Sequence, residues 1–86
     1  MEPGDTESQA RALLASRRIL ARMKLELVDR GEAAPGLFGE EDRELLRDDT
    51  QERLREDLRT FAEWHAALGT DPEAALLRMR RDLEGR

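Results

Sequence analysis

The amino-acid sequence predicts a small all-α protein, and three observations lead to that fold class. Fifty-seven of the 86 residues are Ala, Leu, Glu, Lys, Arg, Met or Gln, the residue types with strong helix propensity. One Ile, one Val and four Thr are too few β-branched residues to build a sheet. Glycine and proline fall in four short stretches, at residues 3–4, 31–39, 69–72 and 85, and these divide the chain into helical blocks.

The blocks predict one domain with three helices. We expect a flexible polar leader over residues 1–6, a single helical domain over 7–84 and a short tail at 85–86. Two long helices, 7–30 and 40–68, are expected to form an antiparallel hairpin. A third, shorter helix over 72–84 packs across the hairpin and completes a small three-helix bundle, because two amphipathic helices alone leave an apolar face uncovered.

The first helix is expected to begin at a capping box and to end at a glycine. Thr6 and Gln9 have the spacing of a capping box. Gly31 follows Arg30 and is typical of the left-handed residue just after a helix C-terminus. Between these ends, apolar side chains recur at helical spacing at Leu13, Leu20, Met23 and Leu27.

The connection over residues 31–39 reads GEAAPGLFG and contains a Pro-Gly turn signal. Leu37 and Phe38 place two large apolar side chains in it. Two interpretations stay open: the pair forms a lid under the end of the bundle, or it is an exposed tip that docks a partner.

The second helix opens on three carboxylates, Glu40 to Asp42, which the N-terminal end of a helix dipole favours. Residues 47–53 are all polar, so the chain either continues through them as an exposed helix or breaks near Asp49, where Glu52 completes a second capping box. We expect one helix over 40–68, because no Gly or Pro interrupts it. Its second half carries an apolar stripe with one histidine, at Leu54, Leu58, Phe61, His65 and Leu68.

The third helix has clear boundaries. Gly69 ends the preceding helix, Asp71 is the expected N-cap, and Pro72 suits the first helical position because its missing N–H costs nothing there. One side of the helix is apolar, with Ala75, Leu76, Met79 and Leu83.

Several classes of function are not expected. Without cysteine there are no disulfides, thiolate metal sites or cysteine nucleophiles. His65 is the single histidine and is expected at the edge of the core with one hydrogen bond; no HExxH, GxSxG, P-loop or EF-hand pattern occurs. We therefore expect a protein that is not an enzyme and holds no metal or cofactor. There is no 18-residue apolar run and no signal-like leader, which favours a cytoplasmic protein without membrane contact.

Charge is distributed unevenly along the chain. Residues 10–25 contain five basic side chains and no acidic one, although the whole chain has a net charge of −5. The acidic total disfavours nucleic acid as a partner on electrostatic grounds. We expect the basic half-helix to face the acidic stretch over residues 40–57.

These observations favour a non-catalytic protein–protein interaction module, such as a small adaptor, chaperone or assembly factor. The apolar arc of the first helix is broader than one neighbouring helix needs, which favours a homodimer or a stable heteromer. The alternative is an acidic regulator or inhibitor, an antitoxin-like protein or nucleic-acid mimic, of a nucleic-acid-handling system. Segregated acidic charge would favour that alternative, whereas mixed charge around an apolar stripe favours the adaptor.

The predicted partner-binding patch consists of Phe61, Trp64, His65 and Leu68, joined by Leu37 and Phe38. It contains every aromatic residue of the chain, and aromatic residues are enriched among binding hot spots. The competing interpretation is that the aromatic side chains anchor the core, so that Trp64 is buried.

Overall fold

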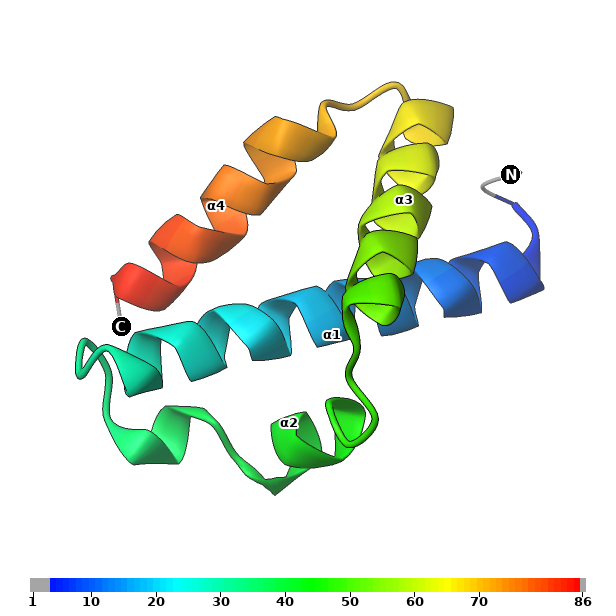
Figure 1. The fold of residues 1–86 in the computed structure, drawn as a ribbon. Coiled ribbons are helices and arrows are strands. Elements are labelled where there is room, and N and C mark those ends of the chain that lie inside the picture. The colour runs from blue at the N-terminus through cyan, green and yellow to red at the C-terminus, as the bar shows by residue number, and fades with distance from the viewer. Residues whose placement is uncertain (1–3, 86) are drawn as a thin grey trace.

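The computed structural model describes residues 4–85, and within that range all regular structure is helical. Four α-helices follow along the chain (Figure 1): α1 (Thr6–Asp29), α2 (Glu40–Leu45), α3 (Gln51–Leu68) and α4 (Pro72–Glu84). A one-turn 3-10 helix, η1 (Pro35–Leu37), lies between α1 and α2. The predicted all-α class is confirmed. Residues 1–3 of the predicted leader and residue 86 of the predicted tail lie outside the described residues.

Helix α1 begins one residue earlier than predicted because Asp5, not Thr6, is its N-cap. The Asp5 carboxylate accepts the backbone N–H of Glu7 at 3.2 Å and the hydroxyl of Ser8 at 3.1 Å. Aspartate is a somewhat better N-cap than threonine, so the earlier residue takes the position. At the other end Gly31 has φ 73° and donates its N–H to the Val28 carbonyl, which confirms the predicted glycine stop.

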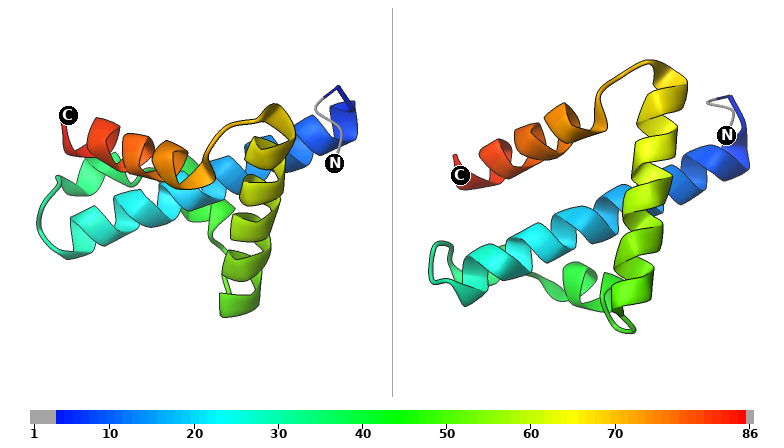
Figure 2. Two further views of the ribbon diagram at one scale, coloured as in Figure 1. Left: turned by 90° about the horizontal axis from the view of Figure 1, so that it is seen from above. Right: turned by 45° about the horizontal axis from the view of Figure 1, so that its top comes forward.

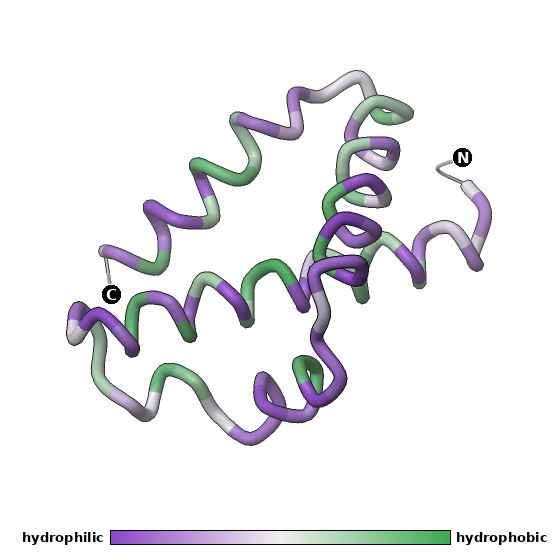
Figure 3. Tube along the Cα trace, viewed as in Figure 1, coloured by the Kyte–Doolittle hydropathy of each residue, from purple (hydrophilic) through white to green (hydrophobic). Residues whose placement is uncertain are grey.

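The prediction of one continuous helix over residues 40–68 is wrong. Helix α2 ends at Leu45 and α3 begins at Gln51, and the connection is among the most hydrophilic parts of the chain (Figure 3). Thr50 caps α3, its hydroxyl accepting the N–H of Arg53 at 3.1 Å. The Asp49 carboxylate instead bonds the side chain of Arg22 on α1. A local cap and a tertiary ion pair thus both favour the break, and an uninterrupted helix would forgo the cap.

The turn from α3 to α4 follows its sequence signals. Gly69 takes a left-handed conformation with φ 75°, and the N–H groups of Gly69 and Thr70 satisfy the carbonyls of Ala66 and His65. Asp71 then caps α4 by accepting the N–H of Glu73 at 3.1 Å, and Pro72 is the first helical residue. The predicted boundaries of this helix are confirmed.

The helices do not form the predicted antiparallel hairpin. Helix α3 crosses α1 steeply, and α4 runs back so that its C-terminal end approaches the C-terminal end of α1 (Figures 1 and 2). The break after α2 explains this arrangement. Helix α2 packs on the C-terminal half of α1, and the break lets the chain change direction before α3 begins. Helices α1, α3 and α4 consequently lie like the sides of a triangle.

The core is small and is provided mainly by α1. Where α3 crosses, α1 presents Ala12, Ala15 and Ile19, and α3 contributes Phe61, which is 3% exposed. Small side chains on α1 let the backbones approach at the crossing. A second contact joins Leu27 of α1 to the end of α4, where Leu83 is buried. Hydrophobic and hydrophilic residues are interspersed along α1, α3 and α4, as in amphipathic helices (Figure 3).

Candidate functional site

The α3 part of the predicted patch occupies the last two turns of α3, and its members differ in exposure. Phe61 lies in the core, so its inclusion in an accessible patch is wrong: it sits on the side of α3 that meets α1. Trp64 and His65 are half-buried. Leu68 is 48% exposed. Along α3 the exposure of the patch therefore increases, from Phe61 through Trp64 and His65 to Leu68.

His65 is held by two neighbours. Its ring centroid lies 4.4 Å from that of Phe61, with the rings tilted by 50°. Its Nδ1 lies 2.7 Å from the hydroxyl of Thr70, and the same hydroxyl lies 3.1 Å from the His65 carbonyl oxygen. When the Thr70 hydroxyl donates to that carbonyl, Nδ1–H of the histidine donates to Thr70. This is the hydrogen-bonded histidine at the core edge that the sequence predicts, fixed in one orientation.

Leu58 extends the patch toward the start of α3, and the predicted set omitted it. It is 39% exposed and lies at helical spacing with the other members. The row Leu58, Phe61, His65 and Leu68, called here the α3 stripe, repeats at intervals of three, four and three residues. Helix α4 packs only sparsely on α3. The ends of the α3 stripe are therefore open.

Leu37 and Phe38 do not join this patch. Residues Pro35–Leu37 form η1, which contacts α1 and not α3, and lies at the far end of the molecule from the end of α3 (Figure 1). Both side chains are half-buried. The structure therefore favours the first of the two open interpretations, in which Leu37 and Phe38 form a lid under the end of the bundle.

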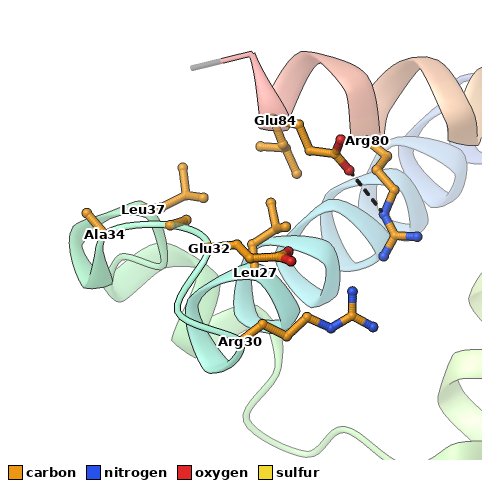
Figure 4. Close-up of a pocket in the computed structure, with 9 residues that line it drawn as sticks. Leu27, Arg30, Glu32, Ala34, Leu37, Arg80 and Glu84 are labelled. Atoms are coloured by element: carbon orange, nitrogen blue, oxygen red, sulfur yellow. Dashed lines mark ion pairs between the residues drawn. The ribbon is translucent and has the colours of Figure 1, made fainter.

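A cleft of about 700 Å³ opens at that end, between the C-terminal ends of α1 and α4 and the connection after α1 (Figure 4). Its apolar floor comes from Leu27, Leu37 and Leu83. Arg30 and Arg80 line it as well, but both guanidinium groups bind the same carboxylate oxygen of Glu26, at 2.6 and 3.1 Å. With its basic groups already paired, the cleft offers a ligand no free cation.

The basic half of α1 pairs with the acidic stretch over residues 40–57, as the sequence predicts. Arg22 reaches two carboxylates, Asp49 at 2.6 Å and Asp57 at 2.8 Å, and Arg18 approaches Asp57 at 3.4 Å. Lys24 lies 3.3 Å from Asp42, which also accepts the N–H of Gly39 at the start of α2. These contacts tie α2, α3 and the connection between them to α1.

The burial of this cluster is the feature that sequence reasoning missed, because the expected pairing of the basic half-helix with the acidic stretch does not show whether the pairs are exposed. The side chain of Asp57 is 6% exposed and that of Arg22 15%. Hydrogen bonding to Arg22 lowers the pKa of Asp49, and the same bond raises the pKa of Arg22. A signal was present in the sequence: Arg18 and Arg22 are four residues apart on α1, and Asp57 lies four residues before the core residue Phe61.

Two features are absent from the described residues: a metal-binding cluster and a membrane-spanning helix. Among residues 4–85, no three His, Cys, Asp or Glu side chains are grouped so as to hold a metal ion. Within the same residues, no helix has the length and apolar character needed to cross a bilayer.

No protein-family model, curated protein or solved structure matches this chain. Inferences about its function therefore rest on its own geometry.

The molecule is more open than a monomeric domain of its size. Its radius of gyration is 13.3 Å, whereas about 12 Å is typical for 86 residues. Its accessible surface is 6093 Å², whereas a compact monomer of 9.9 kDa exposes about 5200 Å². The crossed helices thus leave about 900 Å² more surface than compact packing would.

Proposed function

We propose that this protein is a non-catalytic protein–protein interaction module that acts in the cytoplasm and binds its partner through the α3 stripe. The role needs no reactive group, only an apolar helix face with a polar rim. Leu58 and Leu68 provide accessible apolar surface, and His65 and Trp64 provide half-buried ring surface between them.

The excess surface is the observation that supports this proposal most. A chain this small has little apolar area to spare, because only about 60–65% of its extended surface is buried on folding. An open shape with exposed leucine side chains is stabilised when another molecule covers those side chains. Large leucine side chains exposed on α1, α3 and α4 fit that reading.

The charge arrangement favours the adaptor over the acidic regulator. A nucleic-acid mimic needs an uninterrupted acidic face, but Asp42, Asp49 and Asp57 are paired with basic side chains of α1. The exposed polar side of α3 contains both signs, with Arg55, Arg59, Glu56 and Glu63. A surface of mixed sign suits a partner surface that is also mixed.

Capture by the immobilised full chain tests the proposal, with three variants compared. We expect Leu58→Glu and Leu68→Glu to abolish retention of a bound protein, identified by mass spectrometry. Leu77→Glu is the matched control, because Leu77 is 61% exposed on α4 and lies off the α3 stripe. Retention that all three variants leave unchanged would contradict the proposed site. Loss of retention with Leu77→Glu alone would show that the partner binds α4 and not the α3 stripe.

A further inference from the structure

We infer that the cleft between the C-terminal ends of α1 and α4 binds a small molecule with an apolar body and one positive charge, namely a protonated aliphatic amine. Three features carry the inference: the volume of the cleft, its apolar floor, and the carboxylate of Glu32. Among the described residues, none of α3 lines this cleft. The site is therefore separate from the α3 stripe, and its ligand goes beyond the proposed function.

The size and floor of the cleft suit the apolar part of such a ligand. Its volume of about 700 Å³ lies within the range of about 300–1,000 Å³ that is common for ligand pockets. Leu27 of α1 and Leu83 of α4 form a buried base, and half-buried Leu37 of η1 adds apolar surface from a third element. An alkyl chain placed over these leucines leaves water, which favours binding.

The basic side chains of the cleft are already paired with carboxylates. Nη2 of Arg30 and Nη2 of Arg80 lie 2.6 and 3.1 Å from the same oxygen of Glu26. Nε of Arg80 also lies 3.9 Å from a carboxylate oxygen of Glu84. Two positive charges thus face two negative ones. An anionic ligand would have to compete with these carboxylates for the guanidinium groups, which disfavours it.

Among the described residues of the cleft, Glu32 is the charged side chain without a partner. It is exposed, and its carboxylate projects into the cleft beside Leu27 (Figure 4). Its backbone N–H donates to the Leu27 carbonyl at 2.9 Å, which fixes the position of the residue. Two basic and three acidic side chains thus leave this part of the chain with one negative charge. A ligand with one positive charge balances it.

The two features together specify the orientation of the ligand. An exposed ion pair is worth little alone, so an amine without an apolar body would bind weakly. An apolar molecule without a charge would leave Glu32 unpaired. The bound amine is therefore expected to place its ammonium group at Glu32 and its alkyl chain over Leu27 and Leu83.

Titration of the full chain with octylammonium and with octanoate, followed by amide chemical shifts in NMR spectra, tests the inference. The two probes share one alkyl chain and have opposite charges. We expect octylammonium to cause saturable shifts at Leu27, Leu37 and Leu83, and octanoate to bind about tenfold more weakly. Equal affinity for the two probes, shifts located elsewhere, or no saturable shift would overturn the inference.

Variants at Glu32 test the source of this preference. We expect Glu32→Gln to remove the preference for octylammonium and Glu32→Lys to reverse it in favour of octanoate. Both variants should keep the helical circular dichroism, because Glu32 is exposed. Glu63→Lys is the matched control, since Glu63 is also exposed but lies on α3, away from the cleft. A preference that the Glu32 variants leave unchanged, or that Glu63→Lys reverses as well, would contradict the assigned role of Glu32.

Discussion

Arg22 of α1 and Asp57 of α3 lie 2.8 Å apart, Nη2 to Oδ2, where the two helices cross. The same guanidinium group binds Asp49 through Nε and Nη2, at 3.0 and 2.6 Å. One side chain therefore joins α1 both to α3 and to the connection that precedes it. Because the apolar core is small, this contact is important for keeping α3 in its crossed position.

Replacing Asp57 with alanine is expected to destabilise the fold by about 2 kcal/mol. The change leaves Arg18 without its carboxylate partner and Arg22 with Asp49 alone, and both basic side chains are largely buried. Urea unfolding followed by helical circular dichroism measures the difference. Glu56→Ala is the control, because Glu56 is an exposed neighbour on the same helix. Equal losses in the two variants would show that the ion pair adds nothing at the crossing.

Stability is expected to fall as the pH is lowered below about 4, partly through Asp49. Hydrogen bonding to Arg22 places the pKa of Asp49 below its ordinary value in the folded protein. The unfolded chain therefore takes up this proton first, so the stabilisation is present above the ordinary pKa and is lost as the pH falls through the folded one. Asp49→Asn should reduce the dependence of the unfolding free energy on pH in this range. Asp48→Asn, a change at an exposed neighbouring residue, should not. Parallel profiles for the wild type and Asp49→Asn would contradict the assignment.

Helix ends were the most predictable part of the fold, because they depend on neighbouring residues alone. Gly31, Gly69 and the Asp71-Pro72 pair all act as the sequence indicates. The break between α2 and α3 could not be decided in this way. Its local signals, at Asp49 and Thr50, are balanced by acceptable helix propensity, and the contact that favours the break is with Arg22, 27 residues away in sequence.

Only part of the candidate site could be predicted, because long-range packing also decides which of its residues are exposed. Helical spacing identifies Phe61, His65 and Leu68 as one stripe, but it does not show which end a crossing helix covers. The steep crossing buries Phe61 and leaves Leu58 and Leu68 open, whereas the predicted antiparallel hairpin would have covered the whole row. The position of Leu37 and Phe38 depends on the path of the connection after α1, which no local signal specifies.

Gly69→Ala is expected to destabilise the protein by about 1 kcal/mol, because an L-residue is strained at φ 75°. Space is not the cause, since nothing lies within 4 Å of the position that an added Cβ would occupy. Gly36→Ala is the matched control: its surroundings are equally open and its φ is not positive. Thermal unfolding should lower the midpoint of the first variant and leave the second near the wild type. A reversed order would contradict the left-handed turn.

Site-specific photo-cross-linking tests the central claim, partner binding through the α3 stripe, most directly. A photoreactive side chain replaces Leu58, which is 39% exposed on the stripe, or Ala67, which lies on the opposite side of the same helix. We expect the chain changed at Leu58 to form a covalent adduct with another protein in a cell extract, and the chain changed at Ala67 to form none. Equal cross-linking of the two variants, or cross-linking at Ala67 alone, would contradict the account.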